Sequence, residues 1–305
     1  MAFVRGLLGL MLFFAGMRIM SGALRGAATE RVRVWLAALS GNPLQGFLLG
    51  ALTTAILQSS SLTTVLVVGL VHAAILPLPA GIAVILGANV GTTLTAHLLA
   101  IQVERLGVFI ALAALTAFFL AGKHRFSFLA AAGFGILLTG LDLLTGSLAV
   151  FKDMGILEGA LKAAEGSPLG GVAAGALASA LIQSSSTVMA FVIALAREGA
   201  IGLAPGMYLV FGADIGTCLT SLAASGSTNR AGRRAALAHL FFNMVSAFIV
   251  LTAGPVFVGL VSATSSYLPR QIANGHTLYN LAGGLLFLPL VRQYAFLIMK
   301  LIPDK

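Results

Sequence analysis

The sequence contains very little charge. Only 9% of its 305 residues are Asp, Glu, Lys or Arg, and 59% are hydrophobic, whereas charged residues make up about a quarter of a soluble domain. This composition excludes an ordinary soluble protein and indicates that a lipid bilayer surrounds most of the chain. The single cysteine, Cys218, excludes an intramolecular disulfide, and its apolar run predicts a packing residue.

Enzyme motifs are also lacking. There is no P-loop, which argues against ATP-driven transport by this chain alone, and no nucleophile, base and orienting acid fall within one motif. The net charge of +9 does not indicate nucleic-acid binding, because the basic residues lie in short loops between apolar runs, where they signal membrane topology. We therefore expect no catalytic activity, no cofactor and no nucleic-acid partner.

Long apolar runs are abundant. A helix needs about 20 apolar residues to cross the hydrocarbon core, and about seven such runs occur, at 3–24, 79–101, 105–121, 126–150, 203–223, 235–253 and 276–298. The first run resembles a cleaved secretion signal, but its pattern returns inside the chain, so we interpret it as a retained helix. The predicted fold is an all-α integral membrane protein.

The chain repeats itself at a shift of 125 residues. The segments 42–61 and 167–186 share eleven of twenty residues, and GANVGTTLT at 87–95 aligns with GADIGTCLT at 212–220. These matches indicate a duplicated unit. We assign 1–125 to a first transmembrane repeat and 126–305 to a second repeat with a C-terminal helix, the two forming one transport domain.

In each repeat a polar cluster interrupts an apolar stretch at its midpoint. The arms on either side of QSSS at 58–61 and 183–186 have about 15 residues, so each rises only about 22 Å and is too short for the core of about 30 Å. This predicts a re-entrant helical hairpin with a polar tip near mid-membrane. Three full crossings per repeat then invert the second repeat, an arrangement that recurs in transporters.

Basic residues predict which side faces the cytoplasm, because the richer side is the cytoplasmic one. That side holds Arg25, Arg31, Arg33, Lys123, Arg125, Arg230, Arg233, Arg234, Lys300 and Lys305, and the other holds Arg5, Arg105, Lys152, Lys162, Arg197 and Arg270. We expect a plasma membrane protein of the bacterial inner membrane, with a cytoplasmic C-terminus. The first hairpin then opens to the inside and the second to the outside.

The hairpin tips are the predicted anion site. A helix that starts after a break exposes N–H groups and partial positive charge, so two tips related by a pseudo-twofold axis can hold one phosphate between them. The residues predicted to bind it are Gln58, Ser59, Ser60, Ser61, Gln183, Ser184, Ser185 and Ser186. Two alternatives stay open: the serines pack helices together, and the glutamines satisfy backbone groups at the turns.

The blocks GANVGTT and GADIGTC are predicted to break two crossings, because glycine weakens a helix. Carbonyls freed there, together with side-chain oxygens nearby and in the second hairpin arms, are hard ligands that suit sodium and no transition metal. The predicted cation-binding residues are Thr63, Thr64, Asn89, Thr92, Thr93, Thr187, Asp214 and Thr217.

Asp214 is a carboxylate at membrane depth, which by default marks an ion path or a proton relay. Its repeat mate is the neutral Asn89. We expect Asp214 to bind a cation or to carry a coupling proton, with a structural pairing to an arginine as the alternative. The segments 9–24 and 133–148 align at a shift of 124 residues, which pairs Arg18 with the oppositely charged Asp142, and both residues are expected to be structural.

His-x-x-x-Asn occurs twice, at 239–243 and 276–280, and places both side chains on one helix face. Metal binding is the weaker interpretation and interhelical hydrogen bonding the better one. Arg233 precedes the first pair, and its planar donors make it a candidate for lining the cytoplasmic route of phosphate.

These blocks together resemble the sodium/phosphate cotransporter family, the type II cotransporters and their bacterial relatives. The resemblance rests on the paired QSSS tips, GANVGTT, GADIGTC, RRAALAHLFFN and ANGHTLYNLAGGLLFLPL, and it covers nearly the whole chain. It implies phosphate uptake coupled to sodium, with ligands at both tips. The first repeat lacks an RRAALAHLFFN block, so any role of Arg233 exists in one copy.

Three functional hypotheses follow. The leading one is sodium-coupled phosphate symport by alternating access, with phosphate, sodium and the bilayer as partners and a homo-oligomer left open. The second is transport of another oxyanion, or coupling to protons. The third is a structural or sensory membrane protein whose serine tips only pack helices.

Overall fold

The computed structural model describes residues 2–38, 42–101, 106–120, 125–147 and 155–303. Four of the basic residues used above to predict orientation lie outside these ranges: Arg105, Lys123, Lys152 and Lys305. Arg31 and Arg33 belong to a described helix, but their side chains are not described. Throughout the described ranges the regular elements are helices and none is a strand. The all-α class is confirmed.

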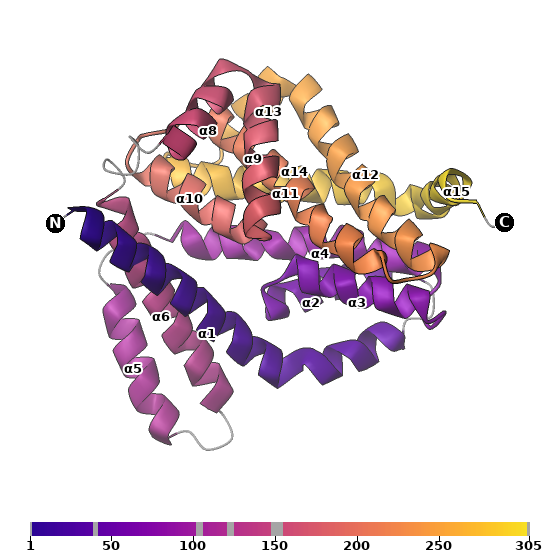
Figure 1. The fold of residues 1–305 in the computed structure, drawn as a ribbon, viewed down its shortest axis with the longest axis horizontal. Helices are drawn as coiled ribbons and strands as arrows, with labels where there is room; N and C mark the ends of the chain where they lie inside the picture. The colour runs from indigo at the N-terminus through magenta and orange to yellow at the C-terminus, as the bar shows by residue number, and fades with distance from the viewer. Residues whose placement is uncertain (1, 39–41, 102–105, 121–124, 148–154, 304–305) are drawn as a thin grey trace.

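The helices follow one another closely along the chain, and α4, α11 and α14 run through the middle of the molecule (Figure 1). Their bounds are α1 (Ala2–Ala37), α2 (Pro43–Leu57), α3 (Ser60–His72), α4 (Leu78–Leu99), α5 (Leu106–Leu120), α6 (Arg125–Thr145), α8 (Gly155–Gly166), α9 (Pro168–Ile182), α10 (Ser185–Arg197), α11 (Leu203–Ser225), α12 (Arg230–Thr252), α13 (Gly254–Ser262), α14 (Leu268–Phe287), the 3₁₀ turn η2 (Leu288–Leu290) and α15 (Val291–Leu301).

Six described segments are long and apolar enough to cross a membrane: Phe3–Gly26, Leu78–Leu99, Arg125–Thr145, Leu203–Ser225, Arg230–Thr252 and Leu268–Leu301. Large apolar side chains also cover the outside, with Phe119 and Leu181 exposed by 81% and 75%, which a hydrocarbon solvent favours and water does not. The prediction of an integral membrane protein is confirmed.

One predicted crossing, at 105–121, lies only partly within the described residues. The run at 105–121 forms α5, and its described length of 15 residues is short for a crossing. The last crossing is longer than predicted but is interrupted at η2, because Pro289 supplies no backbone N–H donor.

Each QSSS cluster ends one helix and begins the next. Gln58 and Gln183 have φ of 52° and 59°, the left-handed conformation that turns a chain out of a helix, and the serine after each is extended and caps the following helix. Thr54 Oγ1 donates to Thr63 Oγ1 at 2.9 Å. Since these residues are nine positions apart, α3 must fold back on α2. The sequence therefore placed both hairpin turns correctly, and their re-entry into the bilayer stays a prediction.

The two repeats share the bounds of their helices, since α9, α10 and α11 begin 125 residues after α2, α3 and α4. The last carbonyls of α4 lie at the base of the second hairpin, where Leu99 accepts from Arg197 at 2.9 Å. The turn after α11 lies at the base of the first hairpin, where Asn229 bonds to His72. Because each of α4 and α11 starts after its own hairpin and ends at the other, the two helices run in opposite directions.

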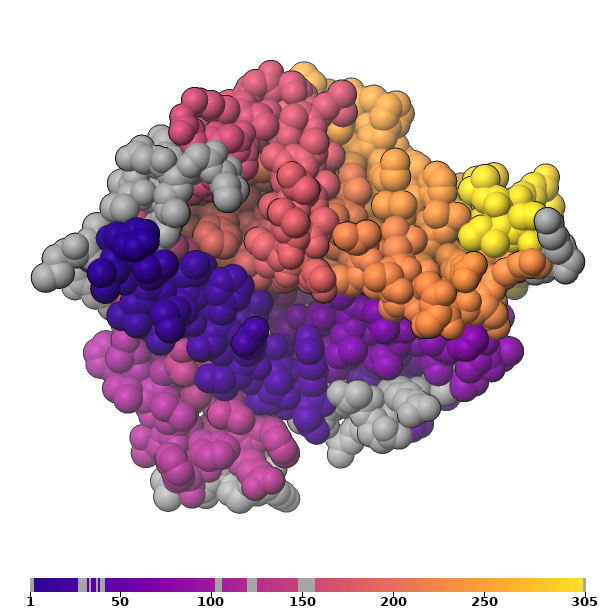
Figure 2. Space-filling model, in the orientation of Figure 1, coloured from indigo at the N-terminus to yellow at the C-terminus, as the bar shows by residue number. Residues whose placement is uncertain are grey.

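The first predicted repeat and the start of the second interleave. The helix α6 belongs to the second repeat by sequence but packs along α1, its counterpart in the first. In the view of Figure 2, α1 to α6 therefore occupy the lower part of the molecule and α8 to α15 the upper part.

The predicted breaks in GANVGTT and GADIGTC are wrong, because α4 and α11 run through both blocks without interruption. Their glycines serve packing. A Cβ atom on Gly87 would lie 1.8 Å from the carbonyl oxygen of Phe47 in α2, and one on Gly212 would lie 2.0 Å from that of Val172 in α9. Small residues allow such close approach of helices in membranes. The carbonyls of the two blocks are therefore not freed by unwinding, although the sequence predicted that they would be.

Candidate binding site at the second hairpin tip

A small internal cavity lies where helices of the two repeats meet. Its lining residues are Thr92, Thr95, Ala96, Ser185, Ser186, Met189, Val210, Ala213, Asp214 and His276. Its volume is about 10 Å³, near the minimum that holds one water molecule. The cavity thus brings two of the predicted phosphate residues, both serines, together with two predicted cation residues, Thr92 and Asp214.

The second hairpin tip presents the start of α10 to this cavity. Ser184 Oγ accepts from the Thr187 N–H at 3.2 Å and from the Thr187 hydroxyl at 3.0 Å. This cap leaves the N–H groups of Ser185 and Ser186 without intrahelical acceptors. Both serines line the cavity, and the partial positive charge of a helix start favours an anion there.

The first hairpin tip reaches the cavity only indirectly. Gln58 donates from Nε2 to the Ala55 carbonyl at 2.5 Å and accepts from Thr95 Oγ1 at 2.9 Å. Gln58 therefore satisfies groups around its turn, which is the structural role left open for it above, whereas Gln183 is exposed. The serines of this tip do not line the cavity. Ser59 caps α3 by accepting from the Leu62 N–H, and Ser60 and Ser61 are the first two residues of α3.

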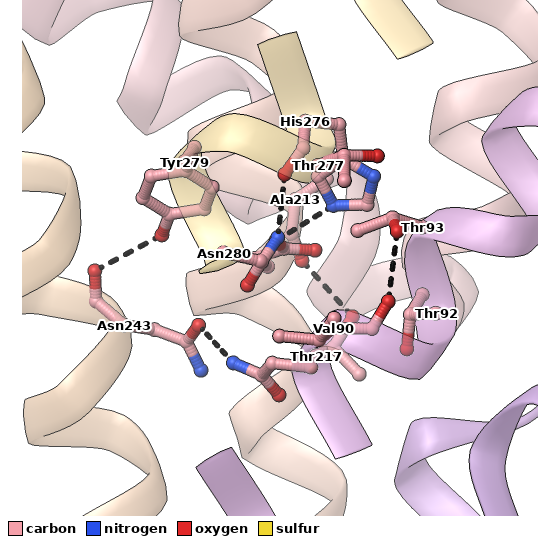
Figure 3. A network of polar contacts seen from close by, with 12 residues as sticks. Val90, Thr92, Thr93, Ala213, Thr217, Asn243, His276, Thr277, Tyr279 and Asn280 are labelled. Carbon is pink, nitrogen blue, oxygen red and sulfur yellow. Dashed lines mark hydrogen bonds and ion pairs between the residues drawn. The ribbon is translucent and has the colours of Figure 1, made fainter. Parts of the chain in front are cut away.

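Asp214 brings a buried carboxylate to the cavity. Its Oδ2 accepts from His276 Nε2 at 2.9 Å and from Asn280 Nδ2 at 3.0 Å. Figure 3 shows His276 and Asn280, which both belong to α14. In the described part of the chain, its partners are thus a histidine and an amide, and not the arginine of the structural alternative.

Asn89, the repeat mate of Asp214, lies in a second polar network. Its Nδ2 donates to Asn243 Oδ1 at 2.7 Å, and its Oδ1 is 3.2 Å from His239 Nε2. Asn243 Nδ2 also contacts the sulfur of Cys218 at 3.1 Å. Cys218 is buried, in agreement with the packing role predicted for it. Figure 3 shows Tyr279 donating to the Asn243 carbonyl. The interhelical hydrogen bonding predicted for His-x-x-x-Asn is confirmed in both copies.

Thr63, Thr64, Thr93, Thr187 and Thr217, all predicted cation ligands, do not line the cavity. The hydroxyls of Thr63 and Thr217 pair with hydroxyls of adjoining helices at 2.9 and 2.8 Å. Thr93 faces an outer groove instead. The sequence does not reveal which face of its helix each of these hydroxyls occupies.

Arg233 lies at the start of α12 and not at the cavity. Its guanidinium is exposed and donates to the Gly226 carbonyl at 3.3 Å. The adjacent Arg234 is buried and donates from Nε to the Ile302 carbonyl at 2.9 Å. The two arginines therefore fasten the start of α12 to the preceding turn and to the end of α15.

A charge cluster fastens the base of the second hairpin. Arg197 Nη1 lies 3.0 Å from Asp142 Oδ1, and Arg197 Nη2 donates to the carbonyls of Leu99 and Ile101 at 2.9 and 3.1 Å. The structural role expected of Asp142 fits this cluster, in which it pairs with Arg197, whereas Arg18 is exposed.

Three further residues of the site, Thr95, His276 and Asn280, were not selected from the sequence as ligands. The repeated His-x-x-x-Asn spacing carried a signal for two of them, since it predicted side chains on one helix face. The helix that those side chains meet depends on packing, which the spacing does not reveal.

The chain is similar to membrane transport proteins over most of its length. The model of the Na+/Pi-cotransporter family matches residues 12–146 and 152–273. A protein of Bacillus subtilis (strain 168), named "Uncharacterized protein YqeW", is 33% identical over 301 residues, which cover 97% of each chain.

Two other relatives match in part. The "Putative inorganic phosphate export protein YjbB" of Escherichia coli (strain K12) is 28% identical over 85% of this chain and 48% of its own length, so the chain spans about half of it. The "Sodium-dependent phosphate transport protein 2B" of Homo sapiens is 41% identical over 64 residues, 21% of this chain and 9% of its own. No solved structure matches the chain.

Proposed function

Because the chain belongs to the Na+/Pi-cotransporter family, we propose that it carries inorganic phosphate across the membrane in symport with sodium, by alternating access. One observation carries this proposal: a helix start suited to an anion and a carboxylate suited to a cation meet in one buried cavity, at Ser185, Ser186 and Asp214. Sodium is the coupling ion, and no cofactor takes part.

The charges around the cavity give the coupling a physical basis. The N–H groups and hydroxyls of Ser185 and Ser186 attract an oxyanion, since a helix start carries about half a positive charge. Asp214 repels the same anion. A sodium ion beside Asp214 and the Thr92 hydroxyl removes that repulsion, and by linkage phosphate then strengthens sodium binding by the same factor.

Phosphate is too large for the cavity in this conformation, because about 10 Å³ corresponds to about one water molecule. Binding therefore requires the lining helices to separate. The base of the second hairpin is anchored by Arg197 to α4 and α6, so a movement at its tip opens the cavity while the base stays in place.

The opposite directions of α4 and α11 support two inverted repeats, 1–125 and 126–305, which form one transport domain and work by alternating access. The bases of the two hairpins lie at opposite ends of α4 and α11, as their contacts with Asn229 and Arg197 indicate. In the proposed bacterial inner membrane, with a cytoplasmic C-terminus, one re-entrant hairpin opens to each side. Arg233 then lies at the cytoplasmic end of the route.

Proteoliposomes that contain the purified protein test the proposal. We expect labelled phosphate to enter when sodium is higher outside and to leave when the gradient is reversed; both directions matter because one relative is named for phosphate export. Equal uptake with choline in place of sodium would contradict sodium coupling. Uptake driven by external acid would assign the coupling to protons, and strong competition by sulfate would reassign the substrate.

Ser185→Ala tests the anion half of the site. The substitution removes a hydroxyl donor, and a hydrogen bond to a charged group contributes about 1.5–3 kcal/mol, so we expect the KM for phosphate to rise about tenfold or more. Ser262→Ala is the matched control, since the hydroxyl of this exposed serine of α13 donates to the Gly259 carbonyl of its own helix. An unchanged KM in Ser185→Ala, Ser186→Ala and the double variant would return these serines to helix packing.

A further inference from the structure

The two His-x-x-x-Asn pairs surround two residues that the repeat makes equivalent. The pair at 276–280 in α14 donates to Asp214 in α11, and the pair at 239–243 in α12 bonds to Asn89 in α4. Asp214 and Asn89 occupy the same place in GADIGTC and GANVGTT. The two clusters therefore have one plan, with a charge at the centre of only one.

The α14 cluster contains acceptors that have no donor. His276 Nε2 and Asn280 Nδ2 both donate to Asp214 Oδ2, and no hydrogen bond among the described residues uses Asp214 Oδ1. The other ring nitrogen, Nδ1, is an acceptor when the ring is neutral, and the amide oxygen of Asn280 is always an acceptor. That nitrogen and Asn280 Oδ1 are buried without a partner. Unpaired buried acceptors around one negative charge favour a cation and disfavour an anion.

The α12 cluster has no such acceptor. His239 Nδ1 is 3.3 Å from Ser221 Oγ, and its Nε2 is 3.2 Å from Asn89 Oδ1. Asn243 accepts from Asn89 and donates to the sulfur of Cys218 and to the His239 carbonyl. Every polar side-chain atom of this histidine and of the two amides thus lies within hydrogen-bond distance of a partner, and the one hydroxyl hydrogen of Ser221 serves either His239 Nδ1 or the Cys218 carbonyl. The cluster is neutral and closed, and it ties α4, α11 and α12 together.

We propose that His276 and Asn280 are positioning residues that hold the Asp214 carboxylate as the cation site, and that the α12 cluster is its closed, neutral counterpart. By fixing Oδ2, the two donors leave the other carboxylate oxygen to the ion. His276 lines the cavity itself, so the same residue adjoins the space that an ion would fill. This inference rests on the sodium-coupled transport proposed above and names the residues that set the affinity for sodium.

Sodium-dependent thermal unfolding of the purified protein in detergent tests this role without transport. An ion that binds the folded state raises the unfolding temperature, so a titration with sodium chloride, with choline chloride keeping ionic strength constant, gives a half-saturating concentration. Partners that orient a ligand typically change metal affinity about 10- to 100-fold. We therefore expect the half-saturating sodium concentration to rise about 10- to 100-fold in Asn280→Ala. The matched variant Asn243→Ala should lower the unfolding temperature but keep the wild-type half-saturation.

His276→Gln provides a second variant, because glutamine retains an N–H donor. We expect a smaller change in the half-saturating sodium concentration than for His276→Ala. If Asn280→Ala fails to fold, His276→Gln and its match His239→Gln carry the comparison.

The outcomes distinguish the positioning role of His276 and Asn280 from the sodium coupling on which it rests. A wild-type half-saturation in Asn280→Ala and His276→Ala, or equal shifts in the α12 and α14 variants, would overturn the positioning role while sodium coupling stands. A wild-type protein that sodium does not stabilise would contradict the sodium coupling itself.

Discussion

The glutamines at the two hairpin tips have the same backbone conformation but different surroundings. Both adopt positive φ, which costs about 1–2 kcal/mol for a residue with a Cβ atom and is free for glycine. Gln58 recovers part of this cost through side-chain hydrogen bonds to Ala55 and Thr95. Gln183 is exposed and makes no side-chain hydrogen bond to any described residue.

We therefore predict different effects of the same substitution. Gln183→Gly should change the free energy of unfolding by less than about 0.5 kcal/mol, because relief of the left-handed conformation offsets the greater freedom of glycine in the unfolded chain. Gln58→Gly loses two hydrogen bonds and should be destabilised by about 1–3 kcal/mol. Thermal unfolding in detergent measures both, and equal effects would contradict this assignment of roles.

A single charge change tests the cation half of the site. A unit charge about 4 Å from sodium contributes about 4 kcal/mol at an effective dielectric constant of 20, so Asp214→Asn should weaken sodium binding more than about 100-fold. Sodium-driven phosphate uptake and sodium-dependent unfolding should both report this loss. Glu158→Gln is the control, since Glu158 lies at the surface and pairs with Lys162. Unchanged sodium dependence and transported charge in Asp214→Asn would make Asp214 structural.

At the scale of elements, spacing alone predicted the positions of the two hairpin turns. The turn positions follow from the length of each arm and from a polar cluster too short to be a loop, and the structure has α2 and α9 ending directly before Gln58 and Gln183. Capping explains this agreement, because Ser59 and Ser184 accept from N–H groups three residues on. These are local interactions, which a sequence specifies directly.

The glycine blocks show where local reasoning ends. Glycine weakens an isolated helix, and this rule predicted breaks in α4 and α11 that are absent. Helix packing outweighs it, because Gly87 and Gly212 let α2 and α9 approach at backbone distance. The faces of Thr63, Thr93 and Thr217 were unpredictable for a related reason, since each depends on which helix lies alongside.

The packing role of the glycines gives a prediction for this scale. Gly87→Ala places a Cβ atom 1.8 Å from the Phe47 carbonyl oxygen, and overpacking of this kind typically costs about 1–3 kcal/mol or more. Gly69→Ala in α3 meets nothing within 4 Å and should stabilise the helix by about 0.5–1 kcal/mol. Unfolding temperatures in detergent check the pair. A Gly87→Ala variant as stable as the wild type would show that α2 can shift away at little cost.

At the scale of the whole molecule, the two repeats are joined at the bases of the hairpins. His72 of the first hairpin bonds to Asn229, and Arg197 of the second bonds to α4 and α6. Each hairpin is thus tied to helices beyond its own pair, and the two bases lie at opposite ends of the antiparallel α4 and α11. The duplicated sequence predicts two such units, but only the three-dimensional contacts reveal how they interlock.

This arrangement predicts opposite exposure of equivalent residues. Ala73 and Glu198 are exposed residues that end α3 and α10, at matching positions of the repeat. Single cysteines can be read at both positions because the native Cys218 is buried. In inverted repeats, a membrane-impermeant maleimide should label Glu198→Cys in intact spheroplasts and Ala73→Cys only after lysis.

Controls and alternative outcomes distinguish topology from orientation. The unsubstituted protein should stay unlabelled, and Ser227→Cys, exposed in the turn that adjoins Asn229, should behave like Ala73→Cys because the two sites lie at the same end of the molecule. Labelling of Ala73→Cys and Glu198→Cys from one side would contradict the inverted repeats. If Ala73→Cys were labelled in intact spheroplasts and Glu198→Cys only after lysis, the repeats would still be inverted and only the cytoplasmic assignment would be overturned. The helix contacts that separate the two ends of the molecule do not depend on which end faces the cell interior.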